Sequence, residues 1–394
     1  MPGNPQIPTG EAFAWRLAAF YAALCVVMGV QLPFLPVWLA AKGFDANEIG
    51  IVLAIPMIVR VFAIPVATRA ADRRDALRVA IVVVAAAAAA GYATVGLAQG
   101  SLAIMAAFAL ASAFYSPMMP LADAYAFRGL GRHGRSYGPV RLWGSAAFIA
   151  GTFAAGVLLD VIAARDLIWL IVGAMVLTLA AACALAPLGP SGQGVPETLL
   201  STKAIWRDRT FLAVAAAASL IQASHAVYYG FSTLDWQAAG LDGVTIGALW
   251  ALGVIAEIAL FALSGRLPVG PTALIMVGAA GAVVRWVAMA ADPPFALLPA
   301  LQCLHALSFG ATHLGALGFI ARAAPPALAA SAQGYLAVAQ GLVMAAAMGL
   351  AGVLYARFGG LAYGAMALIA AAGGLVALAA HRLRQVSDSE ISNQ

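Results

Sequence analysis

Long apolar runs separated by short polar segments make up almost the whole chain. A helix needs about 20 mostly apolar residues to cross the hydrocarbon core of a bilayer, and twelve runs approach or exceed that length. We therefore predict an all-α integral membrane protein with twelve transmembrane helices. They are expected near residues 15–40, 47–69, 77–99, 101–127, 138–160, 166–187, 209–236, 244–265, 271–291, 295–321, 328–356 and 361–383.

One polar stretch is longer than the others and divides the chain in two. It is predicted to be a cytoplasmic central loop at residues 189–208, between an N-terminal six-helix half at 1–188 and a C-terminal six-helix half at 209–394.

The two halves contain related sequences. WLAAKGFDANEIG (38–50) resembles WQAAGLDGVTIG (236–247) when one gap is allowed, and the same alignment places Arg60 opposite Glu257. Parallel repeats of six helices are the plan of a large class of secondary transporters. The repeat therefore predicts a transporter of small molecules.

Composition supports a membrane location. The chain is 63% hydrophobic and 9% charged, whereas soluble domains carry about 25% charged residues. Of 21 Lys and Arg residues, only Lys42, Arg165 and Arg357 fall in segments expected outside the cell. Because cations collect in cytoplasmic loops, we predict that both termini are cytoplasmic. The net charge of +5 needs no nucleic-acid partner to explain it.

Motifs for catalysis or metal binding are not expected. The G-x-S-x-G match at 134–138 falls in a short loop between two predicted membrane helices, whereas a nucleophile elbow joins a strand to a helix. No P-loop is present, and Cys25, Cys183 and Cys303 lack metal-ligand spacing. We expect no cofactor and no metal. A multi-span enzyme or scaffold is the alternative class, and it should contain a catalytic constellation or a large polar domain.

Ionisable residues inside the predicted spans are the candidates for function. One charge at the middle of a helix costs about 3 kcal/mol on insertion scales, so these groups should pair or face water. They are Arg60, Arg141, Arg285, Asp123, Asp235, Glu257, His225, His305 and His313.

Counting along each span predicts how deep these groups lie. Glu257, Arg285 and His305 fall near the bilayer midplane on three consecutive spans, so we expect them to converge. Asp123 and Arg141 should meet across one helical hairpin near the cytoplasmic side. Such groups either serve transport or only fix the positions of the helices.

Several segments resemble a known family. ATRAADRR (67–74), which contains Asp72 and Arg73, is a degraded form of the loop signature of the major facilitator superfamily. YGPVRLWGSAAFIAG (137–151), HAVYYGFSTLDWQAAG (225–240) and VVRW (283–286) resemble the 3-phenylpropionate transporters in its lactose-permease-like branch.

The resemblance implies proton symport in a bacterial inner membrane, with Asp72 and Arg73 in a gating loop. Lactose permease is similar in its carboxylate–Arg pair on spans four and five. It also has an acid, an Arg and a His on spans eight, nine and ten. This chain departs from it at Ser308, where the permease has a proton-releasing Glu.

The predicted reaction is proton-driven uptake of a small aromatic carboxylate by a monomer. Guanidinium groups suit carboxylates because their planar donor fork matches two oxygens. The alternatives are a neutral sugar or nucleoside, and export instead of uptake. The predicted substrate-binding residues are Arg60, Asp123, Arg141, Tyr228, Trp250 and Arg285. The predicted proton-coupling residues are Glu257, His305, His225 and Asp235.

Overall fold

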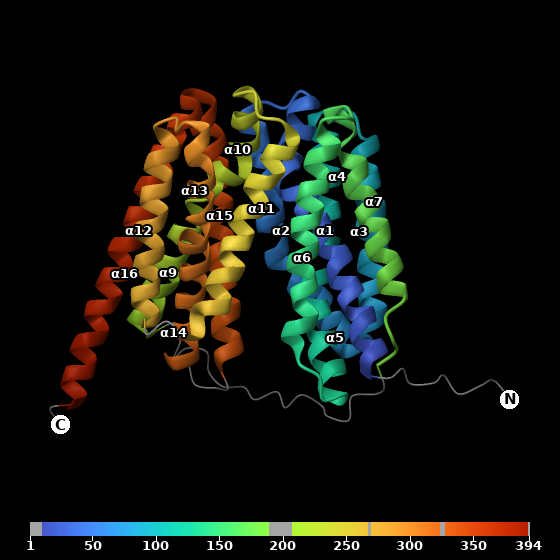
Figure 1. The fold of residues 1–394 in the computed structure, drawn as a ribbon. Helices are drawn as coiled ribbons and strands as arrows, with labels where there is room; N and C mark the ends of the chain where they lie inside the picture. The colour runs from blue at the N-terminus through green and yellow to red at the C-terminus, as the bar shows by residue number, and fades with distance from the viewer. Residues whose placement is uncertain (1–9, 189–206, 267–268, 324–327, 393–394) are drawn as a thin grey trace. The chain divides into compact units, whose positions relative to one another are not determined.

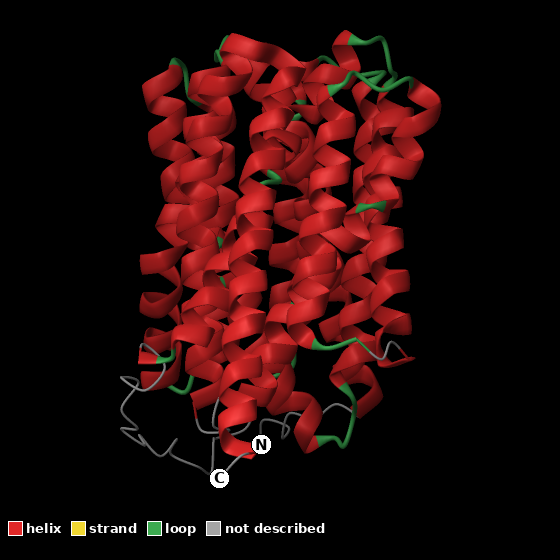
Figure 2. Ribbon diagram, turned by 90° about the vertical axis from the view of Figure 1, so that its left-hand side faces the viewer, coloured by secondary structure: helices red, strands yellow, loops and turns green. Residues whose placement is uncertain are grey.

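The computed structural model describes residues 10–188, 207–266, 269–323 and 328–392. All regular secondary structure in these ranges is helical (Figure 2). An apolar chain in lipid must satisfy its backbone hydrogen bonds internally, and a helix does so within a single segment. The prediction of an all-helical protein is therefore confirmed.

The helices before the central polar stretch begin and end close to the predicted spans (Figure 1). They are α1 (Gly10–Ala41), α2 (Ala46–Arg73), α3 (Leu77–Leu97), α4 (Ser101–Tyr115), α5 (Met118–Arg132), α6 (Tyr137–Leu159) and α7 (Ile168–Cys183), the last preceded by the short turn η1 (Ala164–Asp166).

The helices after the central polar stretch also lie close to the predicted spans. Two of these spans, near 209–236 and 295–321, are divided into shorter helices. The helices are α9 (Arg209–Ala223), α10 (Ala226–Ala238), α11 (Gly243–Leu263), η2 (Ser264–Arg266), α12 (Pro271–Ala290), η3 (Phe295–Leu297), α13 (Leu298–Cys303), η4 (Ala306–Ala311), α14 (Thr312–Ala323), α15 (Ala329–Phe358), η6 (Gly359–Leu361) and α16 (Ala362–Ser392).

Eleven helical segments among the described residues are long and apolar enough to cross a membrane. The last of them, Ser331–Arg382, includes most of α15 and most of α16. Gly359 separates these two helices with a φ of 54°, a conformation that favours glycine. The predicted central loop lies outside the described residues, apart from Arg207 and Asp208.

Three predicted spans contain interruptions that the hydrophobic pattern does not reveal. The span near 101–127 breaks at Ser116 and Pro117, and the span near 209–236 breaks at Ser224 and His225. The span near 295–321 contains the π-helical segment η4. Short π-helical segments are often found at functional sites.

Contacts divide the chain into two compact units. Unit 1 includes the described residues of 1–44, 58–195 and 240–248, and unit 2 includes those of 45–57, 196–239 and 249–394. In unit 1, α1 packs against α6 and α7, while α3 packs against α4 and α7. In unit 2, α16 packs against α12 and α9, and α12 also contacts η4 and α14.

Small residues allow the closest helix contacts in both units. A Cβ atom at Gly29 of α1 would lie 2.4 Å from the carbonyl oxygen of Phe148 on α6, and one at Gly278 of α12 would lie 2.1 Å from Oγ1 of Thr312 on α14. Membrane helices associate through such close packing of small residues. The contact at Gly278 brings the next two turns of α12, including Arg285, close to the η4 segment.

Candidate functional site

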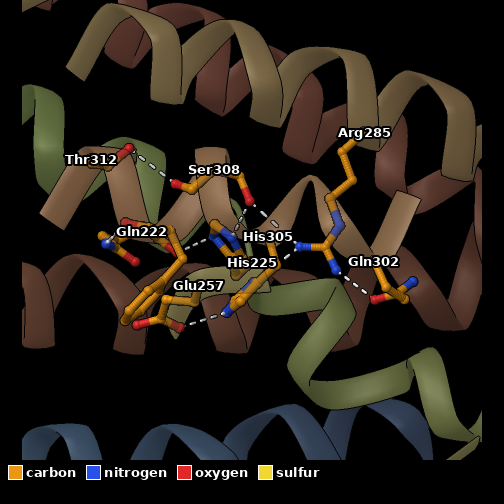
Figure 3. A network of polar contacts seen from close by, with 9 residues as sticks. Gln222, His225, Glu257, Arg285, Gln302, His305, Ser308 and Thr312 are labelled. Carbon is orange, nitrogen blue, oxygen red and sulfur yellow. Dashed lines mark hydrogen bonds and ion pairs between the residues drawn. The ribbon is translucent and has the colours of Figure 1, made fainter. Parts of the chain in front are cut away.

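Unit 2 contains a buried polar network that we call the Arg285 cluster (Figure 3). Its members are Arg285 on α12, Glu257 on α11, Gln302 on α13, Ser308 within η4, His305 just before η4, and His225 between α9 and α10. The predicted convergence of Glu257, Arg285 and His305 is therefore present in the structure.

Arg285 is completely buried, with 0% of its surface exposed. Its Nη2 donates a hydrogen bond to Oε1 of Gln302 over 2.7 Å. Its Nη1 lies 3.1 Å from Nδ1 of His305 and 3.4 Å from Oγ of Ser308. These acceptors are neutral, and no described carboxylate forms an ion pair with Arg285. The hydrogen-bond partners of the cation are thus all uncharged groups.

Two aromatic rings cover the guanidinium of Arg285. Its central carbon lies 4.4 Å from the ring centroid of Tyr228 and 4.6 Å from that of Trp286. The negative faces of such rings attract cations. Trp250, another predicted substrate residue, lies 4.4 Å from Tyr228 between ring centroids. Tyr228 and Trp250 thus both belong to the surroundings of Arg285.

His305 lies between Arg285 and Glu257, so the acid and the cation do not contact each other directly. Nε2 of His305 is 3.6 Å from Oε2 of Glu257. Arginine can only donate, so Nδ1 of His305 accepts from it and the ring proton belongs on Nε2. We assign this tautomer from the hydrogen-bond partners. It directs the imidazole N–H towards the Glu257 carboxyl group.

His225 occupies the break between α9 and α10 and is also completely buried. Its Nδ1 lies 3.0 Å from the carbonyl oxygen of Gln222 and 3.2 Å from that of Ile221. Its Nε2 lies 3.0 Å from Oγ of Ser308. His225 therefore belongs to the Arg285 cluster through Ser308.

Unit 1 contains a second polar group of side chains, which we call the Asp123 cluster. Oδ1 of Asp123 accepts hydrogen bonds from the hydroxyls of Tyr21, over 2.6 Å, and Tyr137, over 2.8 Å. The guanidinium of Arg141 lies 5.5 Å from the ring centroid of Tyr21 and its Nη1 lies 3.9 Å from Sγ of Cys25. Asp123 and Arg141 thus share Tyr21 as a neighbour.

The expected ion pair between Asp123 and Arg141 is not among the ion pairs of the described residues. Two tyrosine hydroxyls take the place of the guanidinium as hydrogen-bond donors to Asp123. The sequence analysis did not identify Tyr21 or Tyr137. Tyr137 lies four residues before Arg141 in a helix, and this spacing is a signal that could have identified it.

The remaining predicted residues lie elsewhere. Arg60 is half-buried on the part of α2 that belongs to unit 1, and Asp72 and Arg73 are exposed at the end of that helix. Asp75, in the loop that follows, forms an ion pair with Arg128. Asp75 was not among the residues predicted from the sequence. Asp235 accepts a hydrogen bond from the hydroxyl of Tyr355 on α15.

Comparisons with known proteins agree with this architecture. The MFS_1-like family model matches residues 14–371. A probable 3-phenylpropionic acid transporter of Escherichia coli (strain K12) is 35% identical, over 90% of this chain and 94% of that protein. A maltose permease of Geobacillus stearothermophilus is 30% identical, over 84% of this chain and 87% of the permease.

Solved structures show the same fold. The crystal structure of the nucleoside transporter NupG superposes with a TM-score of 0.79 at 17% identity, covering 94% of this chain and 98% of the other. These relatives are transporters and permeases rather than enzymes. The prediction of a multi-pass membrane transporter is confirmed, and the chain belongs to the MFS_1-like family of the major facilitator superfamily.

Proposed function

We propose that this transporter takes up a small aromatic carboxylate together with protons, by alternating access. The observation that carries the proposal is the isolated positive charge of Arg285. A buried cation is costly unless an opposite charge or well-placed hydrogen bonds accompany it. A carboxylate substrate would supply the missing negative charge.

Unfilled hydrogen-bond donors beside the cation support an acceptor-rich ligand. Nε of Arg285 and Nε2 of Gln302 are buried and have no hydrogen-bond partner within the described part of the chain. Buried polar atoms usually have partners. Tyr228, Trp250 and Trp286 provide the aromatic surface that a ring-bearing substrate would contact. The similarity to a probable 3-phenylpropionic acid transporter favours the same class of substrate.

Glu257 and His305 are the side chains that we propose for the proton. In the assigned tautomer Nε2–H of His305 points at the Glu257 carboxyl group, 3.6 Å away, so Glu257 is the group that can take up a proton there. His305 itself can take a second proton only at Nδ1, once Arg285 no longer occupies that nitrogen. Asp235, bonded to Tyr355, is a second candidate carboxyl group. We also propose the roles that the sequence predicts for four other residues. Substrate binding is proposed for Arg60 and Arg141, and a gating loop for Asp72 and Arg73.

We also propose the number of spans, their orientation and the membrane that contains the protein. Counting α15 and α16 separately gives twelve spans, and the distribution of Lys and Arg favours cytoplasmic termini. We place the transporter as a monomer in a bacterial inner membrane. The two six-helix halves are proposed at residues 1–188 and 209–394.

A neutral sugar or nucleoside is the second candidate substrate. The Asp123 cluster favours it, because the tyrosine hydroxyls and the carboxylate of that cluster are groups that bind substrate hydroxyls well. The maltose permease and the nucleoside transporter NupG also favour it.

Uptake by proteoliposomes tests the proposal. Labelled 3-phenylpropionate, maltose and uridine are each supplied outside vesicles with an acidic exterior. We expect accumulation of the carboxylate alone. Arg285→Gln should reduce it at least tenfold, because glutamine keeps hydrogen-bonding capacity but lacks the charge. Protein-free vesicles correct for passive entry of the neutral acid. Equal uptake by the variant would remove Arg285 from the site.

A further inference from the structure

Two irregular backbone segments face each other in the Arg285 cluster. His225 lies where α9 gives way to α10, and Ser308 lies within the π-helical segment η4. Both side chains are completely buried, and they contact each other through Nε2 of His225 and Oγ of Ser308. Nδ1 of His225 contacts carbonyl oxygens at the end of α9, but the contact of its Nε2 with Ser308 joins two different segments and requires a separate explanation.

The hydrogen-bond partners assign a direction to this contact. Nδ1 of His225 faces the carbonyl oxygens of Ile221 and Gln222, which only accept, so Nδ1 carries the ring proton. Nε2 must then accept the single proton of the Ser308 hydroxyl. The lone pairs of that hydroxyl are left for Nη1 of Arg285, at 3.4 Å.

We infer that His225 and Ser308 are positioning residues, which orient the Arg285 guanidinium for substrate and do not carry the transported proton. The inference rests on the proposed function and reassigns His225, which the sequence analysis placed on the proton path. The backbone carbonyls fix His225, His225 fixes the hydroxyl of Ser308, and the hydroxyl presents an acceptor to Arg285. Gln302 holds the other end of the guanidinium.

A second proton on His225 would destroy this arrangement. Nε2 would become a donor, so it would no longer accept and fix the proton of the Ser308 hydroxyl, and it would compete with Arg285 for the lone pairs of that oxygen. The rings that contact His225 supply no negative charge to balance an imidazolium. The rings that face His225 belong to Tyr229, Trp286, His305 and Phe309.

The charged groups near His225 also oppose a second proton on its ring. Arg285 is one hydroxyl away, so its charge would repel an imidazolium. Glu257 contacts His305 rather than His225. Within the described residues, none of the hydrogen bonds of His225 goes to a carboxylate.

Transport kinetics in proteoliposomes test the roles of the two residues. Ser308→Ala and His225→Leu should each raise KM for 3-phenylpropionate about tenfold, which corresponds to about 1.4 kcal/mol. In both variants, the ratio of internal to external substrate at saturating substrate should equal that of the wild type. The pH dependence of uptake should also be unchanged. His225→Gln retains an acceptor near Nε2 and should recover part of the loss in KM. Ser219→Ala is the matched control, because this buried hydroxyl bonds only within its own helix, to Ala215.

A different result would overturn the inference. If His225→Gln exchanges substrate across the membrane but no longer accumulates it against a gradient, His225 carries the proton. If Ser308→Ala leaves KM unchanged, the hydroxyl does not position Arg285.

A double-mutant cycle separates this inference from the proposed function. Thermal unfolding of the purified full-length protein is measured for Ser308→Ala, Arg285→Met and the double variant. The effects of residues in contact are not additive, so we expect Ser308→Ala to lower Tm less in the Arg285→Met background. This holds even if the wild type transports no carboxylate, which would refute only the proposed function. Additive effects would refute the positioning role.

Discussion

In both the Arg285 cluster and the Asp123 cluster, a neutral side chain separates two charged side chains. His305 stands between Glu257 and Arg285, and Tyr21 contacts both Asp123 and Arg141. A direct salt bridge would satisfy each charge within the protein. The intervening groups instead leave Arg285 available to an incoming anion.

Tyr21 permits a test of the Asp123 cluster. Tyr21→Phe removes one of two hydroxyl donors to a partly buried carboxylate, and a hydrogen bond to a charged group contributes about 1.5–3 kcal/mol. We expect a lower Tm of the purified protein and weaker transport. Tyr115→Phe is the control, because its hydroxyl has no hydrogen-bond partner within the described residues. If both variants unfold alike, the Tyr21 hydroxyl contributes nothing specific.

The residues missed at this scale share one property. Ionisable groups in apolar spans were selected as candidate functional residues because their burial is costly. Tyr21, Tyr137 and Gln302 are neutral and attract no such notice, and Ser308 was noted only as a departure from lactose permease. Their importance comes from the charged groups beside which the fold places them. Only Tyr137, four residues before Arg141, has a local sign of this in the sequence.

Whole helices were much more predictable than their interruptions. Apolar runs identify spans because the bilayer fixes their length. Pro117 marks the break between α4 and α5 by its missing N–H group. Neither Ser224 nor His225 is a Pro or Gly, so the break there has no local signal. Hydrogen bonds of His225 to backbone carbonyls accompany that break.

Close packing of α12 against α14 gives a prediction at the scale of elements. Gly278→Ala places a methyl group 2.1 Å from Oγ1 of Thr312, and overpacking of this kind costs about 1–3 kcal/mol. We expect a clearly lower Tm together with weaker substrate binding, because Arg285 lies on the same helix. In the matched control Gly173→Ala, the new methyl group meets no atom within 4 Å. An equal loss in both variants would contradict this account of the packing.

At the scale of the whole molecule, the sequence repeat has placed opposite charges at equivalent positions. The alignment of the two halves sets Arg60 on α2 against Glu257 on α11. Composition and repeat were sufficient to predict a membrane transporter. They could not predict that parts of α2 and α11 fall into different compact units, because that division depends on contacts distant in sequence.

Substrate-driven proton movement tests the central claim most directly. Proteoliposomes without a pH gradient contain a trapped pH indicator, and 3-phenylpropionate is added outside. We predict internal acidification faster than that of protein-free vesicles, which report passive entry of the acid, and faster than that of Arg285→Gln vesicles. Glu257→Gln should abolish this excess while retaining exchange of labelled substrate, because glutamine cannot carry the proton. The account is contradicted if the wild type acidifies no faster than Arg285→Gln, or if Glu257→Gln acidifies as fast as the wild type.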